Sequence, residues 1–254
     1  MADRVVAIIP ARGGSKSIPW KNVRKLGGRP LLEWVVAAAR QAKTLDAVYV
    51  STENEEIARI ARKAGAKVID RPEGLAGDLT PDQPVFEHAL RKIRPGCGLA
   101  RWGLDEIIVH LRATGPFVRP ADIDDIVQLL GKNFLSSVRS VVRATEHPRK
   151  MYAEAGHFSF NRYPNVYGTD VLVPYTGDRH AANAPRQSLE PVWRAVGYVD
   201  AVRAQIVAEG SMEGPLVGCW EVPAPLAVDL DTEEQWAAAE RRVKEYRWRP
   251  GIIT

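Results

Sequence analysis

Short apolar runs rich in Val and Ile alternate with amphipathic segments over residues 1–144, and this alternation constrains the fold more than any other feature. The apolar runs are typical of strands buried on both faces of a sheet, and they lie at 5–10, 47–52, 66–70, 106–111 and 136–144. The amphipathic segments predict helices at 30–43, 53–65, 81–93 and 120–130. Strands that alternate with helices form βαβ units, so we predict an α/β fold with a mostly parallel sheet flanked by helices.

The alternation stops between residues 145 and 195, a stretch rich in aromatic residues, Pro, Gly and Asn. Because a structureless loop of this length is uncommon inside a compact domain, we expect an irregular or hairpin-like arm that packs on something else, such as a second subunit. Strand-like runs at 198–207, 214–222 and 225–231 and a helix at 232–246 follow. The length of 254 residues suits one domain, 1–254, with 145–195 as an inserted arm.

The charge balance is mildly basic, with 35 Lys and Arg against 31 Asp and Glu and a net charge of +4. This suits an anionic small-molecule substrate and is too small for a nucleic-acid-binding protein, although an ordinary solvated surface explains it equally well. The chain has two cysteines, Cys97 and Cys219, which are too few for disulfide bonds to hold a fold of this length together. This indicates a reduced, cytoplasmic protein. Neither a signal peptide nor an apolar run long enough to span a membrane is present in the sequence.

The loop after the first predicted strand reads ARGGSKSIPWKN at residues 11–22. Ligands of open parallel sheets bind beyond the carboxyl ends of the strands, so this loop is the first candidate site. Its cations Arg12, Lys16 and Lys21 suit a polyphosphate, and its two adjacent glycines allow a ligand to approach closely. An exposed basic turn is the alternative. The loop matches neither a P-loop nor the dinucleotide fingerprint, which excludes those two classes.

A second candidate site is the sequence VDLDT at residues 228–232. Alternate residues of a strand point the same way, so Asp229 and Asp231 can converge on one cation. Their hard oxygen ligands fit Mg²⁺ beside a phosphate site. Alternatively, Asp231 or Thr232 caps the following helix, with Glu234 placed for a capping box.

The five histidines show no spacing typical of metal ligands, and the chain has no G-x-S-x-G nucleophile motif. His110 lies inside the predicted strand at 106–111 and is interpreted as a structural residue. The sequence therefore indicates a site built from cations and carboxylates, without a strong protein nucleophile.

The segment IIPARGGSKSIPWKN, residues 8–22, resembles the N-terminal signature of acylneuraminate cytidylyltransferases, the CMP-sialic acid synthetases, with Ser17 in place of the usual Gly. The resemblance continues through 28–36, 48–78 and DLDTEEQW at 229–236, and it covers essentially the whole chain. It implies a Rossmann-like nucleotidyltransferase sheet. It also implies an enzyme that transfers CMP from CTP to the anomeric hydroxyl of a nine-carbon α-keto acid sugar and releases pyrophosphate.

The same resemblance implies roles for individual residues. Lys16, Arg12 and Lys21 would be the catalytic cations, with Lys16 stabilising the charge at the α-phosphorus. Asp229 and Asp231 would hold Mg²⁺, the expected cofactor. Catalysis of this kind depends chiefly on positioning and electrostatics. The implied nucleotide-binding residues are Ala11, Arg12, Gly13, Gly14, Ser15, Lys16, Asn22 and Arg71.

The acceptor end departs from the family pattern L-Q-P-T-S-P-L-R, because residues 111–118 read LRATGPFV. Arg112 replaces the family's Gln with a cation that suits a carboxylate or a phosphonate. Thr114, Arg186 and Gln187 complete the implied acceptor contacts, and the arm at 145–195 implies a homodimer. The acid could be sialic, legionaminic or pseudaminic acid, eight-carbon Kdo or a phosphonate. Another base and a non-catalytic nucleotide-binding protein also stay open as alternatives.

Overall fold

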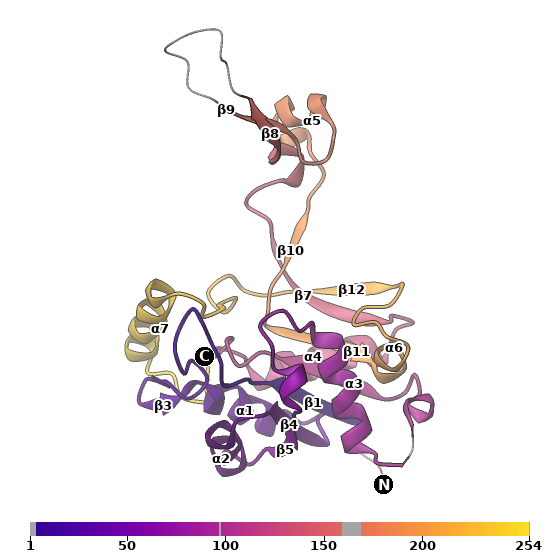
Figure 1. The fold of residues 1–254 in the computed structure, drawn as a ribbon, viewed down its shortest axis with the longest axis vertical. Helices are drawn as coiled ribbons and strands as arrows, with labels where there is room; N and C mark the ends of the chain where they lie inside the picture. The colour runs from indigo at the N-terminus through magenta and orange to yellow at the C-terminus, as the bar shows by residue number, and fades with distance from the viewer. Residues whose placement is uncertain (1–3, 97, 159–168, 254) are drawn as a thin grey trace. The chain divides into compact units, whose positions relative to one another are not determined.

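The computed structural model describes residues 4–96, 98–158 and 169–253. The contacts within the chain divide it into two units, one formed by residues 1–142 and 195–254 and the other by residues 143–194. Figure 1 shows the order of the elements along both units.

The first unit is built on a mixed, mostly parallel sheet. Its strands are β1 (Val5–Pro10), β4 (Ala47–Thr52), β5 (Lys67–Asp70), β6 (Ile107–Leu111), β7 (Ser137–Arg143), β11 (Val199–Arg203) and β12 (Val217–Glu221). They lie in the order β7-β11-β6-β1-β4-β5, with β12 paired to β7. Only β11 runs antiparallel to its neighbours among these strands. The predicted α/β fold with a mostly parallel, Rossmann-like sheet is confirmed.

Helices cover both faces of this sheet. Successive residues of β1 therefore pack into two different hydrophobic clusters, one on each face. Ala7 and Ile9 pack in a cluster with residues of α1 (Leu31–Gln41), α2 (Glu55–Lys63), α4 (Pro120–Gly131) and α7 (Glu233–Tyr246). Val6 and Ile8 pack in a second cluster with residues of α3 (Asp82–Ile93) and α6 (Ala204–Ala208). This period of two is the reason the strand sequences are continuously apolar.

The second unit contains the antiparallel hairpin of β8 (Tyr152–Phe158) and β9 (Thr169–Pro174) and the helix α5 (Arg179–Asn183). β10 (Trp193–Ala195) lies at the boundary between the units along the chain. The role predicted for this segment, in contacts with a second subunit and an acceptor, stays a prediction. The remaining short elements are β2 (Lys25–Leu26), β3 (Arg29–Pro30) and the 3-10 helices Glu73–Leu75, Leu99–Arg101, Pro148–Lys150 and Arg186–Ser188.

Two strand predictions near the C-terminus are wrong. Residues 204–208, which belong to the strand-like run 198–207 or follow it, form α6 instead. Residues 225–231 form no strand, and their backbone makes local hydrogen bonds instead, such as that from the Val228 N–H to the Leu226 carbonyl at 2.8 Å. The segment is nevertheless fixed, since Leu230 is fully buried and its backbone N–H donates to the Thr114 carbonyl at 3.0 Å.

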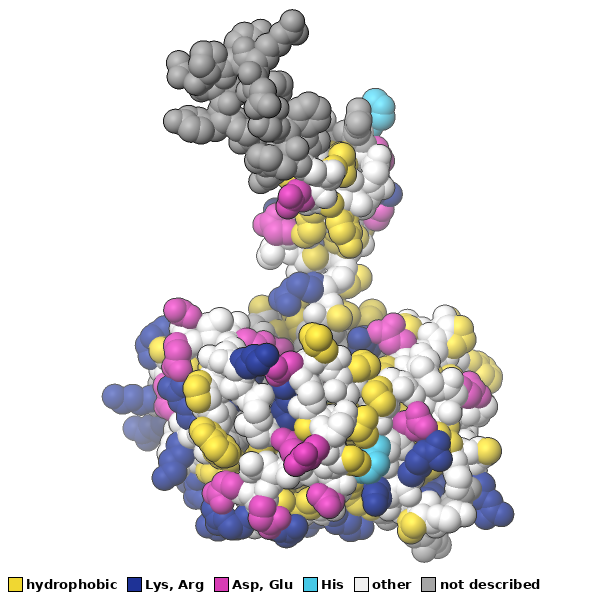
Figure 2. All heavy atoms as spheres, viewed as in Figure 1, with side chains coloured by type: hydrophobic (Ala, Val, Ile, Leu, Met, Phe, Trp, Pro, Cys, Tyr) yellow, Lys and Arg dark blue, Asp and Glu magenta, His cyan; other side chains and the backbone are white. Residues whose placement is uncertain are grey.

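The surface carries basic and acidic side chains intermixed over the face of the first unit drawn in Figure 2. Cys219 is a free, exposed cysteine, whereas Cys97 lies outside the described residues. In the part of the chain that the structure describes, no helix is both long and apolar enough to cross a membrane.

Candidate active site

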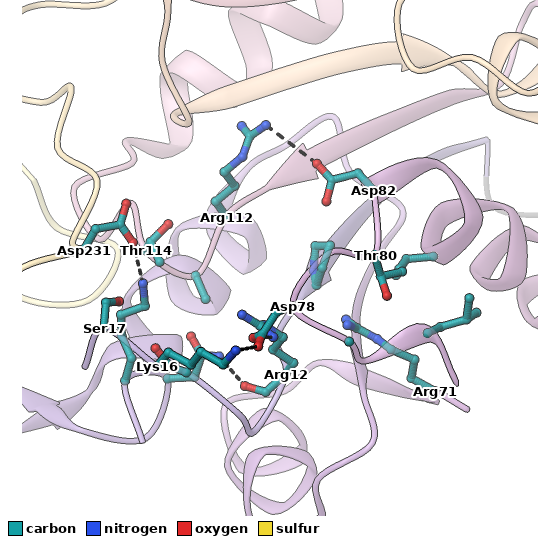
Figure 3. Close-up of a pocket in the computed structure, with 18 of the residues that line it drawn as sticks. Arg12, Lys16, Ser17, Arg71, Asp78, Thr80, Asp82, Arg112, Thr114 and Asp231 are labelled. Carbon is teal, nitrogen blue, oxygen red and sulfur yellow. Dashed lines mark hydrogen bonds and ion pairs between the residues drawn. The ribbon is translucent and has the colours of Figure 1, made fainter. Parts of the chain in front are cut away.

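A cleft of about 490 Å³ lies beyond the carboxyl ends of β1 and β6. The chain runs from β1 outward to β4 and β5 and then returns to β6 on the other side of β1, so the strand order reverses here. Such a switch point is where open α/β sheets bind ligands. Figure 3 shows the side chains that converge on the cleft. Those predicted from the sequence are Arg12, Ser15, Lys16, Lys21, Asn22, Arg71, Arg112, Thr114 and Asp231.

The backbone just after β1 is anchored to β4 and to the start of α2. The Ala11 N–H donates to the Ser51 carbonyl at 3.0 Å, and the Gly13 N–H donates to Glu53 Oε1 at 2.6 Å. A Cβ at Gly13 would lie 2.9 Å from Asn54 Nδ2, so this close approach requires glycine. A Cβ at the neighbouring Gly14 would meet no heavy atom within 4 Å. These contacts position the loop, and the predicted nucleotide contacts of Ala11, Gly13 and Gly14 stay predictions.

Two loop cations meet at one carboxylate at the end of the cleft where the sequence predicts phosphates. Arg12 and Lys16 both form ion pairs with Asp78, which lies in the segment between β5 and α3 (Figure 3). Their hydrogen bonds hold the pKa of Asp78 below its ordinary value. The Lys16 side chain is 83% exposed, so its ammonium group is accessible to a ligand. Donors that bind a carboxylate in this way can also bind phosphate oxygens.

Lys21 and Asn22 are buried at the base of the loop. Lys21 Nζ lies 2.7 Å from Asp231 Oδ1, and Asn22 Nδ2 donates to the Arg12 carbonyl at 2.9 Å. Lys21 therefore links the loop at residues 11–22, the basic loop, to the segment at residues 228–232, the acidic segment. Asn22 fixes the backbone that carries Arg12.

Arg71 is buried beside β4, where its Nε and Nη2 donate to the hydroxyl and the carbonyl of Ser51. Burial lowers the pKa of Arg71. These contacts fix the start of the segment that carries Asp78. The predicted role of Arg71 in nucleotide binding stays a prediction.

The acidic segment offers a carboxylate oxygen without a partner. Asp229 Oδ1 is buried and makes no hydrogen bond within the described residues, whereas the Asp231 side chain is 57% exposed. A buried, unpaired carboxylate oxygen is unfavourable unless a cation or a donor satisfies it. Among the described residues no group of three or more His, Cys, Asp or Glu could hold a metal ion. Mg²⁺, however, usually takes only one or two carboxylates together with waters and phosphates, so carboxylates of this kind suit it. The strand alternation that predicts the convergence of Asp229 and Asp231 is absent from these described residues, and of the two only Asp231 lines the cleft, so their shared cation stays a prediction.

The helix α7 is capped by Thr232, whose hydroxyl accepts from the Gln235 N–H. The Gln235 side chain accepts in turn from the Thr232 N–H at 2.8 Å. The capping box therefore uses Gln235, and the prediction of Glu234 is wrong, because the third helical position lies three residues after the cap. Since Thr232 provides the cap, Asp231 remains available to the cleft.

The end of the cleft that the sequence assigns to the acceptor contains Arg112 and Thr114, which follow β6. Arg112 Nη1 lies 3.1 Å from Asp200 Oδ2, and its Nη2 lies 3.9 Å from Asp82 Oδ2. The predicted acceptor residues Arg186 and Gln187 belong to the second unit, so their contacts with an acceptor stay predictions.

His110 lines the cleft as well as being buried, which the sequence interpretation missed. Its ring packs edge-on against Phe86, with ring centroids 4.6 Å apart. Burial lowers its pKa well below the ordinary value, and the cations of Arg112 and Arg139 lower it further. The imidazole is therefore neutral at physiological pH.

Sequence reasoning also missed the acidic residues Asp78, Asp82 and Asp200. Asp78 and Asp82 follow β5, whose carboxyl end lies at the same sheet edge as that of β1. The rule that identified the loop after β1 could have identified this segment too. Asp200 gave no such signal, because it lies in the middle of a strand-like run.

A family model described as cytidylyltransferase matches residues 6–164. The chain is 29% identical over 242 residues to N-acylneuraminate cytidylyltransferase A of Danio rerio, covering 95% of this chain and 51% of that protein. It is 34% identical over 127 residues to 3-deoxy-manno-octulosonate cytidylyltransferase of Anaeromyxobacter sp. (strain Fw109-5), covering 50% and 47%. The chain thus spans about half the length of these curated relatives.

A solved structure of CMP:2-keto-3-deoxy-manno-octonic acid synthetase complexed with CTP has a similar fold. The TM-score is 0.65 at 18% sequence identity, and the match covers 96% of this chain and 99% of that one. At this identity the likeness shows the fold alone.

Proposed function

Because the chain belongs to the cytidylyltransferase family, we propose that it transfers CMP from CTP to the anomeric hydroxyl of an acidic, sialic-acid-like α-keto sugar and releases pyrophosphate. The observation that carries this proposal is the convergence of Arg12 and Lys16 on one carboxylate at the strand-order switch point. An anion held there by charged donors is replaceable by the triphosphate of a nucleotide.

In this proposal the basic loop binds the triphosphate. Lys16 and Arg12 exchange Asp78 for phosphate oxygens, and Lys16 stabilises the charge that develops at the α-phosphorus. Asn22 keeps the backbone at Arg12 in place through its hydrogen bond to that carbonyl. The protein supplies position and electrostatics, so it needs no nucleophile of its own.

Asp229 and Asp231 would hold Mg²⁺, with the buried, unpaired Asp229 Oδ1 as the observation that supports this assignment. When bound, the ion would neutralise charge on the triphosphate and favour ionisation of the attacking hydroxyl. Lys21, which is paired with Asp231, orients that carboxylate relative to the basic loop.

Arg112 and Thr114 would contact the acceptor, and Arg112 provides a permanent cation for its carboxylate. The eight-carbon acid Kdo is the second candidate acceptor, because a relative named for that substrate matches half of the chain.

The second unit would form the contacts of a homodimer through exposed apolar side chains such as Tyr152, Leu172 and Tyr175. A monomer by light scattering at micromolar concentration would contradict the dimer.

The test is pyrophosphate release from CTP, Mg²⁺ and N-acetylneuraminic acid, with each component omitted in turn and with Kdo and other nucleotides as substitutes. We expect release that depends on all three components. No release with any acid, from protein that binds CTP, would overturn the proposed transfer and leave a nucleotide-binding protein.

A further inference from the structure

The guanidinium group of Arg112 is held from a neighbouring strand. β11 pairs antiparallel with β6, and the register places Asp200 opposite His110. Residues opposite each other on paired strands project on the same side of the sheet, and so do residues two apart along one strand. Asp200 therefore projects on the same side as His110 and Arg112. The result is the contact of 3.1 Å between Arg112 Nη1 and Asp200 Oδ2.

The Asp200 carboxylate is itself fixed. Its side chain is only 7% exposed, and Oδ1 accepts from the Ser140 N–H at 3.0 Å. Oδ2 also accepts from Arg139 Nη1 at 3.0 Å. A buried carboxylate with two guanidinium partners on Oδ2 and a backbone N–H on Oδ1 has little freedom to rotate, so it provides a rigid anchor for Arg112.

Gly197 leaves room for the stem of Arg112. A Cβ at position 197 would lie 2.7 Å from Arg112 Cδ, so any other residue there would displace the side chain. This glycine lies three residues before Asp200, and the same stretch of chain therefore provides both the space and the anchor.

The opposite edge of the guanidinium group faces the cleft. Arg112 Nη2 forms an ion pair with Asp82 Oδ2 at 3.9 Å, which is too long for a hydrogen bond and which a ligand carboxylate could replace (Figure 3). The donors on this edge are available to a ligand, and a carboxylate matches the geometry of two parallel guanidinium donors.

We propose that Asp200 is a positioning residue that holds Arg112 with its other edge toward the cleft, where it binds the carboxylate of the acceptor acid. This inference rests on the proposed function for the identity of the acceptor. Asp200 acts through Arg112 and does not itself touch the substrate.

The test compares Asp200→Asn with Glu213→Gln, a matched control that changes a carboxylate on Arg139 without touching Arg112. For the acid that the wild-type protein uses, we expect Asp200→Asn to raise KM about tenfold while kcat and the KM for CTP change less than about threefold. The control should leave all three constants unchanged. Equal KM values for the acid in Asp200→Asn and the wild type would overturn the proposal.

A double-mutant cycle and a second variant separate positioning from general destabilisation. If Asp200 acts through Arg112, then Asp200→Asn should have little further effect on the KM for the acid in an Arg112→Gln background. Additive effects would contradict the proposal. Should Asp200→Asn fail to fold, Gly197→Ala tests the position of Arg112 instead, because it displaces the Arg112 stem and should raise the same KM selectively. An unchanged KM for the acid in Gly197→Ala would overturn the proposal.

Direct binding distinguishes failure of this inference from failure of the proposed function. Calorimetry would use N-acetylneuraminic acid and Kdo with protein loaded with a CTP analogue that has a methylene bridge between the α- and β-phosphorus atoms. Acid binding that weakens about tenfold in Asp200→Asn supports the positioning role even if no pyrophosphate is released. Absence of binding by either acid to the wild-type protein would overturn the inference, whatever the fate of CTP.

Discussion

The two ends of the cleft are built in different ways. At the phosphate end, all three cations lie within the ten residues from Arg12 to Lys21 of one loop, and the Lys16 side chain is largely exposed. At the acceptor end, the contact between Arg112 and Asp200 joins residues 88 positions apart, and the carboxylate is buried. A common triphosphate can be bound by a local motif with movable side chains. Under the proposed function, the acid would instead be bound by a side chain that the sheet holds rigid.

The largest expected effect of a substitution is at the phosphate end. Lys16→Ala removes the cation assigned to the α-phosphorus and should lower kcat by about a hundredfold or more. Because its side chain is 83% exposed, stability should change by less than about 0.5 kcal/mol. Steady-state pyrophosphate release and thermal unfolding check both statements, and near-normal turnover would show that Lys16 has no catalytic role.

Removing an acidic residue beside the phosphate end should affect the metal requirement next. Asp231→Ala should raise the Mg²⁺ concentration needed for half-maximal activity about tenfold or more. Glu234→Gln is the control, since it changes a nearby acid that the capping box does not use. A metal titration identical to that of the wild type would mean that Asp231 serves only to pair with Lys21.

At the acceptor end, Arg112→Gln should weaken use of the acid rather than abolish activity. Replacing the cation with a neutral amide weakens binding of the carboxylate that both acids carry, so kcat/KM for N-acetylneuraminic acid and for Kdo should each fall about tenfold. A rise in relative activity toward sialic acid would show that Arg112 sets the acceptor choice. An unchanged ratio of the two kcat/KM values would show that Arg112 does not determine which acid is preferred.

The smallest expected effect is at Asp78, which competes with the nucleotide for Arg12 and Lys16. Asp78→Asn should tighten CTP binding about threefold, since the ion pairs it removes are solvent-accessible. The lowered pKa keeps this carboxylate ionised at neutral pH, so the ratio of Kd values should be equal at about pH 6 and pH 8. Calorimetry measures both, with Asp105→Asn, a change in a carboxylate paired with Arg4, as the control. Weaker binding by Asp78→Asn would instead make Asp78 part of the nucleotide site.

The contrast between the two ends also explains what the sequence could predict. Strand and helix periodicity locates β1, and the rule for open sheets then identifies the loop that carries Lys16. Asp200 could not be found this way, because its role depends on β11 entering the sheet between β6 and β7. The strand predicted over 225–231 is wrong because its apolar pattern is not specific to strands. Alternate apolar residues such as Leu230 are also buried when an extended loop packs against the core.

The position of β11 determines when the sheet can form during synthesis. β6 and β7 flank β11 in the sheet, yet the whole unit of residues 143–194 is translated before β11 begins at Val199. A nascent chain that ends earlier has unpaired edges on both flanking strands, which are surfaces prone to aggregation. The centre of the sheet is therefore completed late, through contacts between segments far apart in sequence, which makes its assembly slow. Arg112 and Arg139 receive their shared carboxylate only at that stage.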